Sequence, residues 1–155
     1  MIDNESINYL AATLVGEARG EPIEGQIAVA NVIRNRVRVS GGGYKAVCLE
    51  PKQFSCWNND DSNSKLVRNF LSRLESGDDI HEPIFRQCLA IARSIVAEDF
   101  LDNTQGCRNY VTLSRYQLAK ARAANTDLWM LRLKPVVTIG QHIFLSEKES
   151  VLKEV

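Results

Sequence analysis

Hydrophobic residues recur every three or four positions in several stretches of the chain, which is the spacing of helices with one buried face. The first such stretch has apolar side chains at Ile7, Leu10, Ala11, Leu14 and Val15. Asp3 or Asn4 is placed to cap it, because short polar side chains accept hydrogen bonds from the free amides of a first turn. The pattern predicts a buried helix that delivers Glu17 at its carboxyl end and stops at Gly20.

The same spacing predicts further helices. Pro22 suits the first position of a helix over residues 23–39. Its predicted inward residues are Ile23, Ile27, Ala30, Ile33 and Val37. Residues 66–74 form another candidate helix, and Pro83 opens one that runs to about residue 98. The polar residues 58–64 predict an exposed loop.

The last third of the chain changes to patterns typical of strands. A short strand is predicted over residues 107–113, a short helix over 116–123, and a strand from 136 that Gly140 interrupts and that resumes through Phe144. The prediction is an α+β fold, mostly helical with a small β element. Residues 1–146 are expected to form a single domain, and residues 147–155 a charged tail.

Charge and composition exclude several classes. Nineteen basic and nineteen acidic residues give a net charge of zero, so the signature of a nucleic-acid-binding protein is lacking. No apolar run reaches the length of a transmembrane helix, and no signal-peptide pattern opens the chain, so synthesis in the cytoplasm is expected. The four cysteines are irregularly spaced, which predicts buried thiols in place of a metal site, and no cofactor is expected.

Candidate chemistry centres on Glu17, in the string Gly-Glu-Ala-Arg-Gly-Glu-Pro over residues 16–22. Neighbouring apolar residues desolvate this carboxyl group, while the flanking glycines leave room for a bulky substrate; an acid in such a seat can stay protonated near neutral pH. Glu21 either assists it, pairs with Arg19 or favours the start of the next helix. Glu24 is expected at the surface.

A second group of residues suits carbohydrate binding, since amides and hydroxyls bond sugar hydroxyls and aromatic faces stack on sugar rings. Its members are Gln53, Ser55, Trp57 and Tyr110. His142 is expected to face a cleft and to bond either substrate or Glu17. A Cys56–His142 nucleophilic pair, as in a peptidase or amidase, is the competing interpretation.

The string at 16–22 and the segment 24–37, followed by residues 51–57, 102–112 and 137–144, resemble the cell wall hydrolase family typified by spore cortex-lytic enzymes. The resemblance implies a lysozyme-like domain that cleaves the glycan strands of peptidoglycan, as lytic transglycosylases do, with Glu17 as general acid and base. The candidate substrate-binding residues are then Glu21, Gln26, Gln53, Ser55, Trp57, Tyr110 and His142, and no metal is expected.

Alternatives stay open. A hydrolytic muramidase or glucosaminidase would need a second carboxylate, for which Glu21, Asp60 and Asp61 are the candidates. A non-catalytic glycan-binding or assembly protein is the alternative from another class. The single-domain form looks like a phage or prophage endolysin, which would depend on a membrane-permeabilising partner to reach the cell wall or periplasm.

Overall fold

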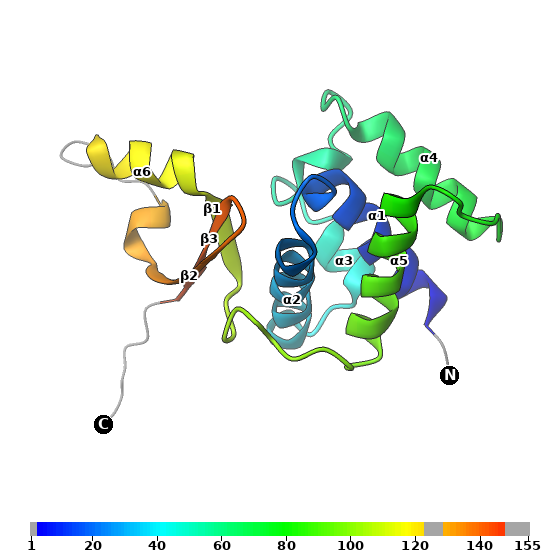
Figure 1. The fold of residues 1–155 in the computed structure, drawn as a ribbon, viewed down its shortest axis with the longest axis horizontal. Coiled ribbons are helices and arrows are strands. Elements are labelled where there is room, and N and C mark those ends of the chain that lie inside the picture. The colour runs from blue at the N-terminus through cyan, green and yellow to red at the C-terminus, as the bar shows by residue number, and fades with distance from the viewer. Residues whose placement is uncertain (1–2, 123–128, 148–155) are drawn as a thin grey trace.

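The computed structural model describes residues 3–122 and 129–147, and its larger part is a group of packed helices (Figure 1). These are α1 (Asn4–Ala18), α2 (Ile23–Ser40), α3 (Tyr44–Cys48), α4 (Ser64–Glu75) and α5 (Pro83–Val96). A 3-10 turn, η1 (Ser55–Trp57), joins α3 to α4. The smaller part contains β1 (Asn109–Thr112), α6 (Leu113–Ala121), η3 (Trp129–Arg132), β2 (Lys134–Ile139) and β3 (His142–Ser146). The predicted α+β class is confirmed.

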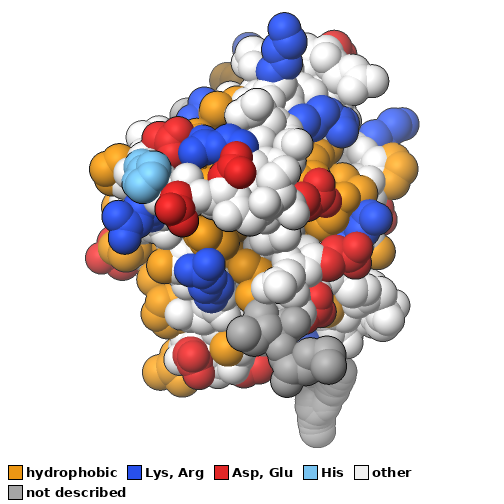
Figure 2. Space-filling model, turned by 90° about the vertical axis from the view of Figure 1, so that its right-hand side faces the viewer, with side chains coloured by type: hydrophobic (Ala, Val, Ile, Leu, Met, Phe, Trp, Pro, Cys, Tyr) orange, Lys and Arg blue, Asp and Glu red, His pale blue; other side chains and the backbone are white. Residues whose placement is uncertain are grey.

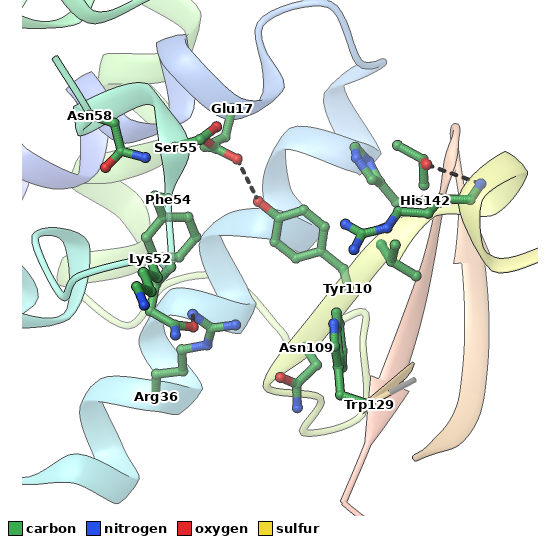
Figure 3. A pocket seen from close by; sticks show the side chains of 14 residues that line it. Glu17, Arg36, Lys52, Phe54, Ser55, Asn58, Asn109, Tyr110, Trp129 and His142 are labelled. Atoms are coloured by element: carbon green, nitrogen blue, oxygen red, sulfur yellow. Dashed lines mark hydrogen bonds between the residues drawn. The ribbon is translucent and has the colours of Figure 1, made fainter. Parts of the chain in front are cut away.

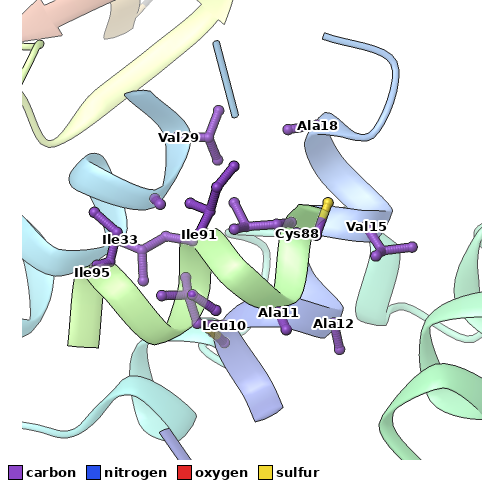
Figure 4. Close-up of a cluster of buried hydrophobic side chains, with 14 of the residues drawn as sticks. Leu10, Ala11, Ala12, Val15, Ala18, Val29, Ile33, Cys88, Ile91 and Ile95 are labelled. Carbon is purple, nitrogen blue, oxygen red and sulfur yellow. The ribbon is translucent and has the colours of Figure 1, made fainter. Parts of the chain in front are cut away.

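Helix α1 lies at the centre of the helical part and packs against α2, α3, α4 and α5. Its start is fixed as predicted, because the side chain of Asp3 accepts a hydrogen bond from the Ser6 amide at 3.0 Å. Leu10 and Val15 of α1 meet Ile33 of α2 and Ile91 of α5 in a continuous apolar core (Figure 4). Burial on several sides makes α1 a rigid support for the residue at its end.

The sheet is antiparallel, with β3 between β1 and β2. Because side chains alternate across a strand, β3 contributes to two different clusters. Phe144 joins the main helical core, whereas Ile143 and Leu145 pack with Tyr116 of α6 and Met130 of η3. This sandwiched position explains why four consecutive residues of β3 are buried.

A set of buried polar side chains on α2 holds the segment that leads to the sheet. Asn31 donates to the carbonyl of Leu101 at 3.3 Å, and Arg34 to that of Phe100 at 3.1 Å. Asn35 donates both to Asp102 at 2.8 Å and to the carbonyl of Cys107 at 2.9 Å. The linker is therefore fixed to α2 by specific hydrogen bonds, which set the position of β1.

Some details of the sequence prediction need correction. Ile23 is 46% exposed, because α2 begins there and its first turn projects beyond the core; the inward face comprises Ala28, Val29, Val32 and Ile33 together with Ala30. The tail prediction falls outside the described residues except at Glu147, which is exposed. In the described ranges no helix combines the length and apolar character needed to cross a bilayer.

Candidate active site

A cavity of about 710 Å³ lies where the helical part faces the sheet (Figure 3). Helices α1 and α2 provide Glu17 and Arg36 to its wall. The loop and turn before α4 provide Lys52, Gln53, Phe54, Ser55 and Asn58. The opposite wall consists of Asn109, Tyr110, Val111, Thr112, Arg115, Trp129 and His142. Five predicted site residues thus come together here: Glu17, Gln53, Ser55, Tyr110 and His142.

Glu17 lies in the last turn of α1, partly buried, and both of its carboxylate oxygens are engaged. Oε1 accepts a hydrogen bond from the hydroxyl of Tyr110 at 3.2 Å, and Oε2 accepts one from the backbone amide of Cys56 at 3.3 Å. These donors come from opposite walls, so the carboxylate is fixed in orientation and faces the cavity (Figure 3).

Gly16 explains how the Cys56 amide reaches Glu17. A Cβ atom at position 16 would lie 2.5 Å from Cys56 Cβ and 2.7 Å from Val67 Cγ2, well inside van der Waals contact. Only glycine therefore allows η1 to approach α1 this closely. Glu17 is the acid, and the preceding Gly16 leaves the space in which the Cys56 amide can reach it.

Tyr110 is a neutral donor to the carboxylate. Burial, and secondly the adjacent charge of Glu17, raise the pKa of Tyr110 well above its usual value of 10.0. The ring is packed by Phe144, with centroids 5.7 Å apart, and meets His142 edge to face at 5.0 Å. The phenol is thus held in place and keeps its proton throughout the physiological pH range.

Glu21 points into the elbow between α1 and α2, next to the hairpin of β2 and β3. Its Oε1 accepts a hydrogen bond from the amide of Gln141 at 3.0 Å and lies 3.4 Å from Nδ1 of His142. That nitrogen is buried and makes no hydrogen bond with any described residue. Gly140, at φ +60°, leaves the space that the carboxylate fills. Glu21 therefore anchors the strand that carries His142. His142 lines the cavity, and the described partners of Glu17 are Tyr110 and Cys56, so of the two expected partners of His142 the substrate stays a prediction.

Two predicted substrate-binding residues lie in the core instead of the cavity. Gln26 is fully buried: its amide donates to the carbonyl of Glu21 at 3.1 Å and accepts from Gln87 at 2.8 Å. The indole of Trp57 is buried and donates to the hydroxyl of Thr13 at 3.0 Å. Both assignments are corrected, because the side-chain amide of Gln26 and the indole N–H of Trp57 make hydrogen bonds within the helical part and are not among the described groups that line the cavity.

The sequence interpretation also missed residues that line the cavity. Arg36 lies on α2 within the segment used for the family resemblance, but nothing in the helical pattern marks it as facing a cleft. Lys52 precedes Gln53 directly, and Trp129 follows a stretch for which no element was predicted. Among described residues no group of three or more His, Cys, Asp or Glu side chains could hold a metal ion.

The Cys56–His142 interpretation also loses its basis. Burial, followed by the neighbouring Glu17 carboxylate, raises the pKa of the Cys56 thiol far above its usual value of 9.0. A nucleophilic cysteine needs the opposite shift, toward the thiolate.

A mostly helical domain that presents a carboxylic acid from its central helix toward a small sheet has the lysozyme-like fold. The chain is similar to the catalytic domain of the germination-specific lytic transglycosylase SleB from Bacillus anthracis, with a TM-score of 0.61 and 23% identity, covering 93% of this chain and 96% of that one. The catalytic domain of Bacillus cereus SleB matches with a TM-score of 0.58 and 23% identity, covering 94% of this chain and 93% of that one. At this identity the likeness is one of fold.

The family model described as cell wall hydrolase matches residues 20–145, so the chain belongs to this family of enzymes. Spore cortex-lytic enzymes are relatives: that of Bacillus subtilis (strain 168) is 44% identical over 54 residues, and that of Oceanobacillus iheyensis 45% over 51 residues. These segments cover 34% and 32% of this chain and 18% of each relative. The family resemblance is confirmed. The matched range begins after Glu17.

Proposed function

We propose that the chain cleaves the β-1,4 bond between N-acetylmuramic acid and N-acetylglucosamine in peptidoglycan, as a lytic transglycosylase with Glu17 as general acid and base. One observation carries the proposal. Among the described residues Glu17 is the one carboxylic acid that lines the large cavity, where two donors hold it in place. Its position at the end of a rigid helix suits proton transfer to a bound polymer.

In the first step the proton of Glu17 passes to the glycosidic oxygen as the bond from C1 of the muramyl sugar breaks. Positive charge develops at C1 and the ring oxygen, and the carboxylate left on Glu17 faces it. The hydroxyl of Tyr110 and the amide of Cys56 then stabilise this carboxylate by charge-assisted hydrogen bonds. Both donors strengthen their interaction just when the negative charge appears, which favours the transition state.

In the second step the Glu17 carboxylate takes the proton of the sugar's own 6-hydroxyl, and O6 forms a bond to C1. The product is a 1,6-anhydromuramyl end, and Glu17 regains its proton without any water being consumed. This route needs no second carboxylate. A hydrolase of the usual kind needs one about 5 to 9.5 Å from the first.

None of the three candidates for a second acid is among the described residues that line the cavity. Asp60 and Asp61 are absent from the described lining of the cavity. Glu21 is turned into the helix elbow, where it binds the Gln141 amide. The geometry therefore favours the transglycosylase over the hydrolytic muramidase or glucosaminidase.

Replacement of Glu17 by Gln tests the proposal. The amide keeps the shape of the side chain and removes the transferable proton, so we expect clearing of purified cell walls to fall by about 10³-fold or more while wall binding persists. Glu24→Gln is the matched control, because Glu24 is an exposed carboxylate on the first turn of α2. Full activity of the Glu17→Gln variant would remove Glu17 from its role.

The products separate the two chemistries. Muropeptides released by the wild type are expected to end in anhydro sugars, which mass spectrometry detects because they lack one water relative to reducing ends. Reducing ends would identify a hydrolase. Wall binding without any cleavage by the wild type would identify a glycan-binding protein.

A further inference from the structure

Among its described lining residues the cavity has an excess of positive charge. Three cationic side chains, Arg36, Lys52 and Arg115, line it together with the single described carboxylate of Glu17. The chain as a whole has a net charge of zero, and on the face that includes α4 and α5 acidic and basic side chains are interspersed (Figure 2). The sugar rings of a glycan backbone are neutral, so bond cleavage alone does not account for these cations.

Arg36 is a partly buried cation whose described hydrogen bonds all go to neutral groups. Its Nε donates to the carbonyl of Arg108 at 2.7 Å, and Nη1 donates to the side chain of Gln53 at 3.1 Å. The guanidinium also lies 5.1 Å from the centre of the Phe54 ring. None of the ion pairs in the described part of the chain includes Arg36. A guanidinium has five N–H donors, so several remain for a ligand in the cavity.

Lys52 lies on the same wall. It precedes Gln53, which Arg36 contacts, and Figure 3 shows it on the opposite side of the cavity from Trp129. Its backbone has φ +69°, a left-handed conformation that is uncommon for a residue with a side chain. Such conformations occur preferentially at binding and catalytic sites. Lys52, too, takes part in no described ion pair.

A second cavity, of about 210 Å³, continues from this wall. It shares Arg36, Gln53 and Asn109 with the main cavity and is also lined by Arg108 and by the carboxylates Glu50 and Glu147. The space beside Arg36 is therefore open on two sides.

We propose that Arg36 and Lys52 form a carboxylate-binding subsite for the branch on the 3-position of the muramyl sugar. This inference rests on the proposed function and adds the group that the site recognises beside the sugar. The carboxylate is either the free lactyl carboxylate of a muramyl sugar that carries no peptide, or a carboxylate of the attached peptide, whose amide bond takes up the lactyl carboxyl group. Both are anions at neutral pH, and a planar guanidinium beside an ammonium group suits either.

The test measures binding, with Glu17→Gln as background so that the polymer is not cut. Four forms of cell wall are compared by cosedimentation: native, native with carboxylates converted to amides by carbodiimide and ammonia, amidase-stripped, and stripped then amidated. We expect wall that carries free carboxylates, whether native or stripped, to bind about three- to fivefold more tightly than the amidated form of the same wall. Lys52→Gln should abolish most of this difference, whereas Lys65→Gln, at an exposed position of α4 outside the cavity, should preserve it.

The stripped walls identify the source of the carboxylate, since stripping removes the peptides and leaves the lactyl group free. A preference for stripped over stripped-and-amidated wall assigns the subsite to the lactyl carboxylate. A preference confined to native wall assigns it to the peptide. Equal binding of all four forms would overturn the subsite while cleavage by the wild type would still support the proposed function. Failure of the wild type to bind or cleave any form would overturn both.

Discussion

Replacement of Gly16 by Ala tests whether the close approach of η1 to α1 controls the active site. The new Cβ would lie 2.5 Å from Cys56 Cβ, 2.6 Å from Cys56 Sγ and 2.7 Å from Val67 Cγ2. Carbon atoms pack at about 3.5 to 4.0 Å, so η1 has to move away by about 1 Å. The hydrogen bond from the Cys56 amide to Glu17 is 3.3 Å long already, and such a shift would break it.

Two effects should follow. Overpacking at a buried contact costs about 1 to 3 kcal/mol in the free energy of unfolding. If Glu17 acts as proposed, loss of one donor to its carboxylate, together with a displacement of about 1 Å, should lower the cleavage rate by about 10- to 100-fold. Urea unfolding gives the first quantity, and the initial rate of wall clearing gives the second.

Gly20→Ala provides the matched control, because a Cβ there meets no atom within 4 Å. We expect its stability and rate to stay near those of the wild type. If Gly16→Ala matched this control in both measurements, the proposed link between the glycine, η1 and the orientation of Glu17 would be refuted.

Two other predictions concern Tyr110 and the linker. Tyr110→Phe removes the hydroxyl that donates to Glu17 but keeps the packed ring, so the cleavage rate should fall by about tenfold or more with little change in the melting temperature; an unchanged rate would contradict a role for the phenol. For Asp102, burial alone would raise the pKa, but hydrogen bonds from Thr104, Asn35 and Gly106 outweigh it and hold the pKa below 3.8. Because the folded state lowers this pKa, its contribution to stability is complete above the unfolded value and is lost as the pH falls through the folded one. In urea titrations, the free energy of unfolding of Asp102→Asn should therefore fall less steeply than that of the wild type as the pH drops below about 4. The same pH dependence in both proteins would show that Asp102 does not contribute.

The local pattern of the sequence was sufficient for most elements of the fold. Apolar spacing predicted α1, α2, α4 and α5, and of the two expected caps, Asp3 and Asn4, the structure has Asp3. The glycine at 140 correctly marked the turn between two strands. These features depend on residues close in sequence, where propensity and periodicity act directly. Ile23 was misplaced because the first turn of a helix can project beyond the core even when its spacing matches.

The candidate site could be predicted only in part, because its contacts join distant segments. Glu17 stood out from its neighbours in sequence, but its partner Tyr110 lies 93 positions away. Gln26 and Trp57 have side chains suited to sugars, yet burial assigns their polar atoms to partners within the helices. Whether an amide or an indole faces a cavity depends on the packing of the whole domain, which residue type alone does not specify.

The two faces of β3 pack against different parts of the protein. Positions 143 and 145 serve the outer cluster with α6, so substitutions there should tune how firmly that layer is attached. Positions 142 and 144 meet Tyr110, so substitutions there should alter the cavity wall that carries Tyr110. A protein engineer could thus vary thermal robustness and substrate handling in one five-residue segment by choosing odd or even positions.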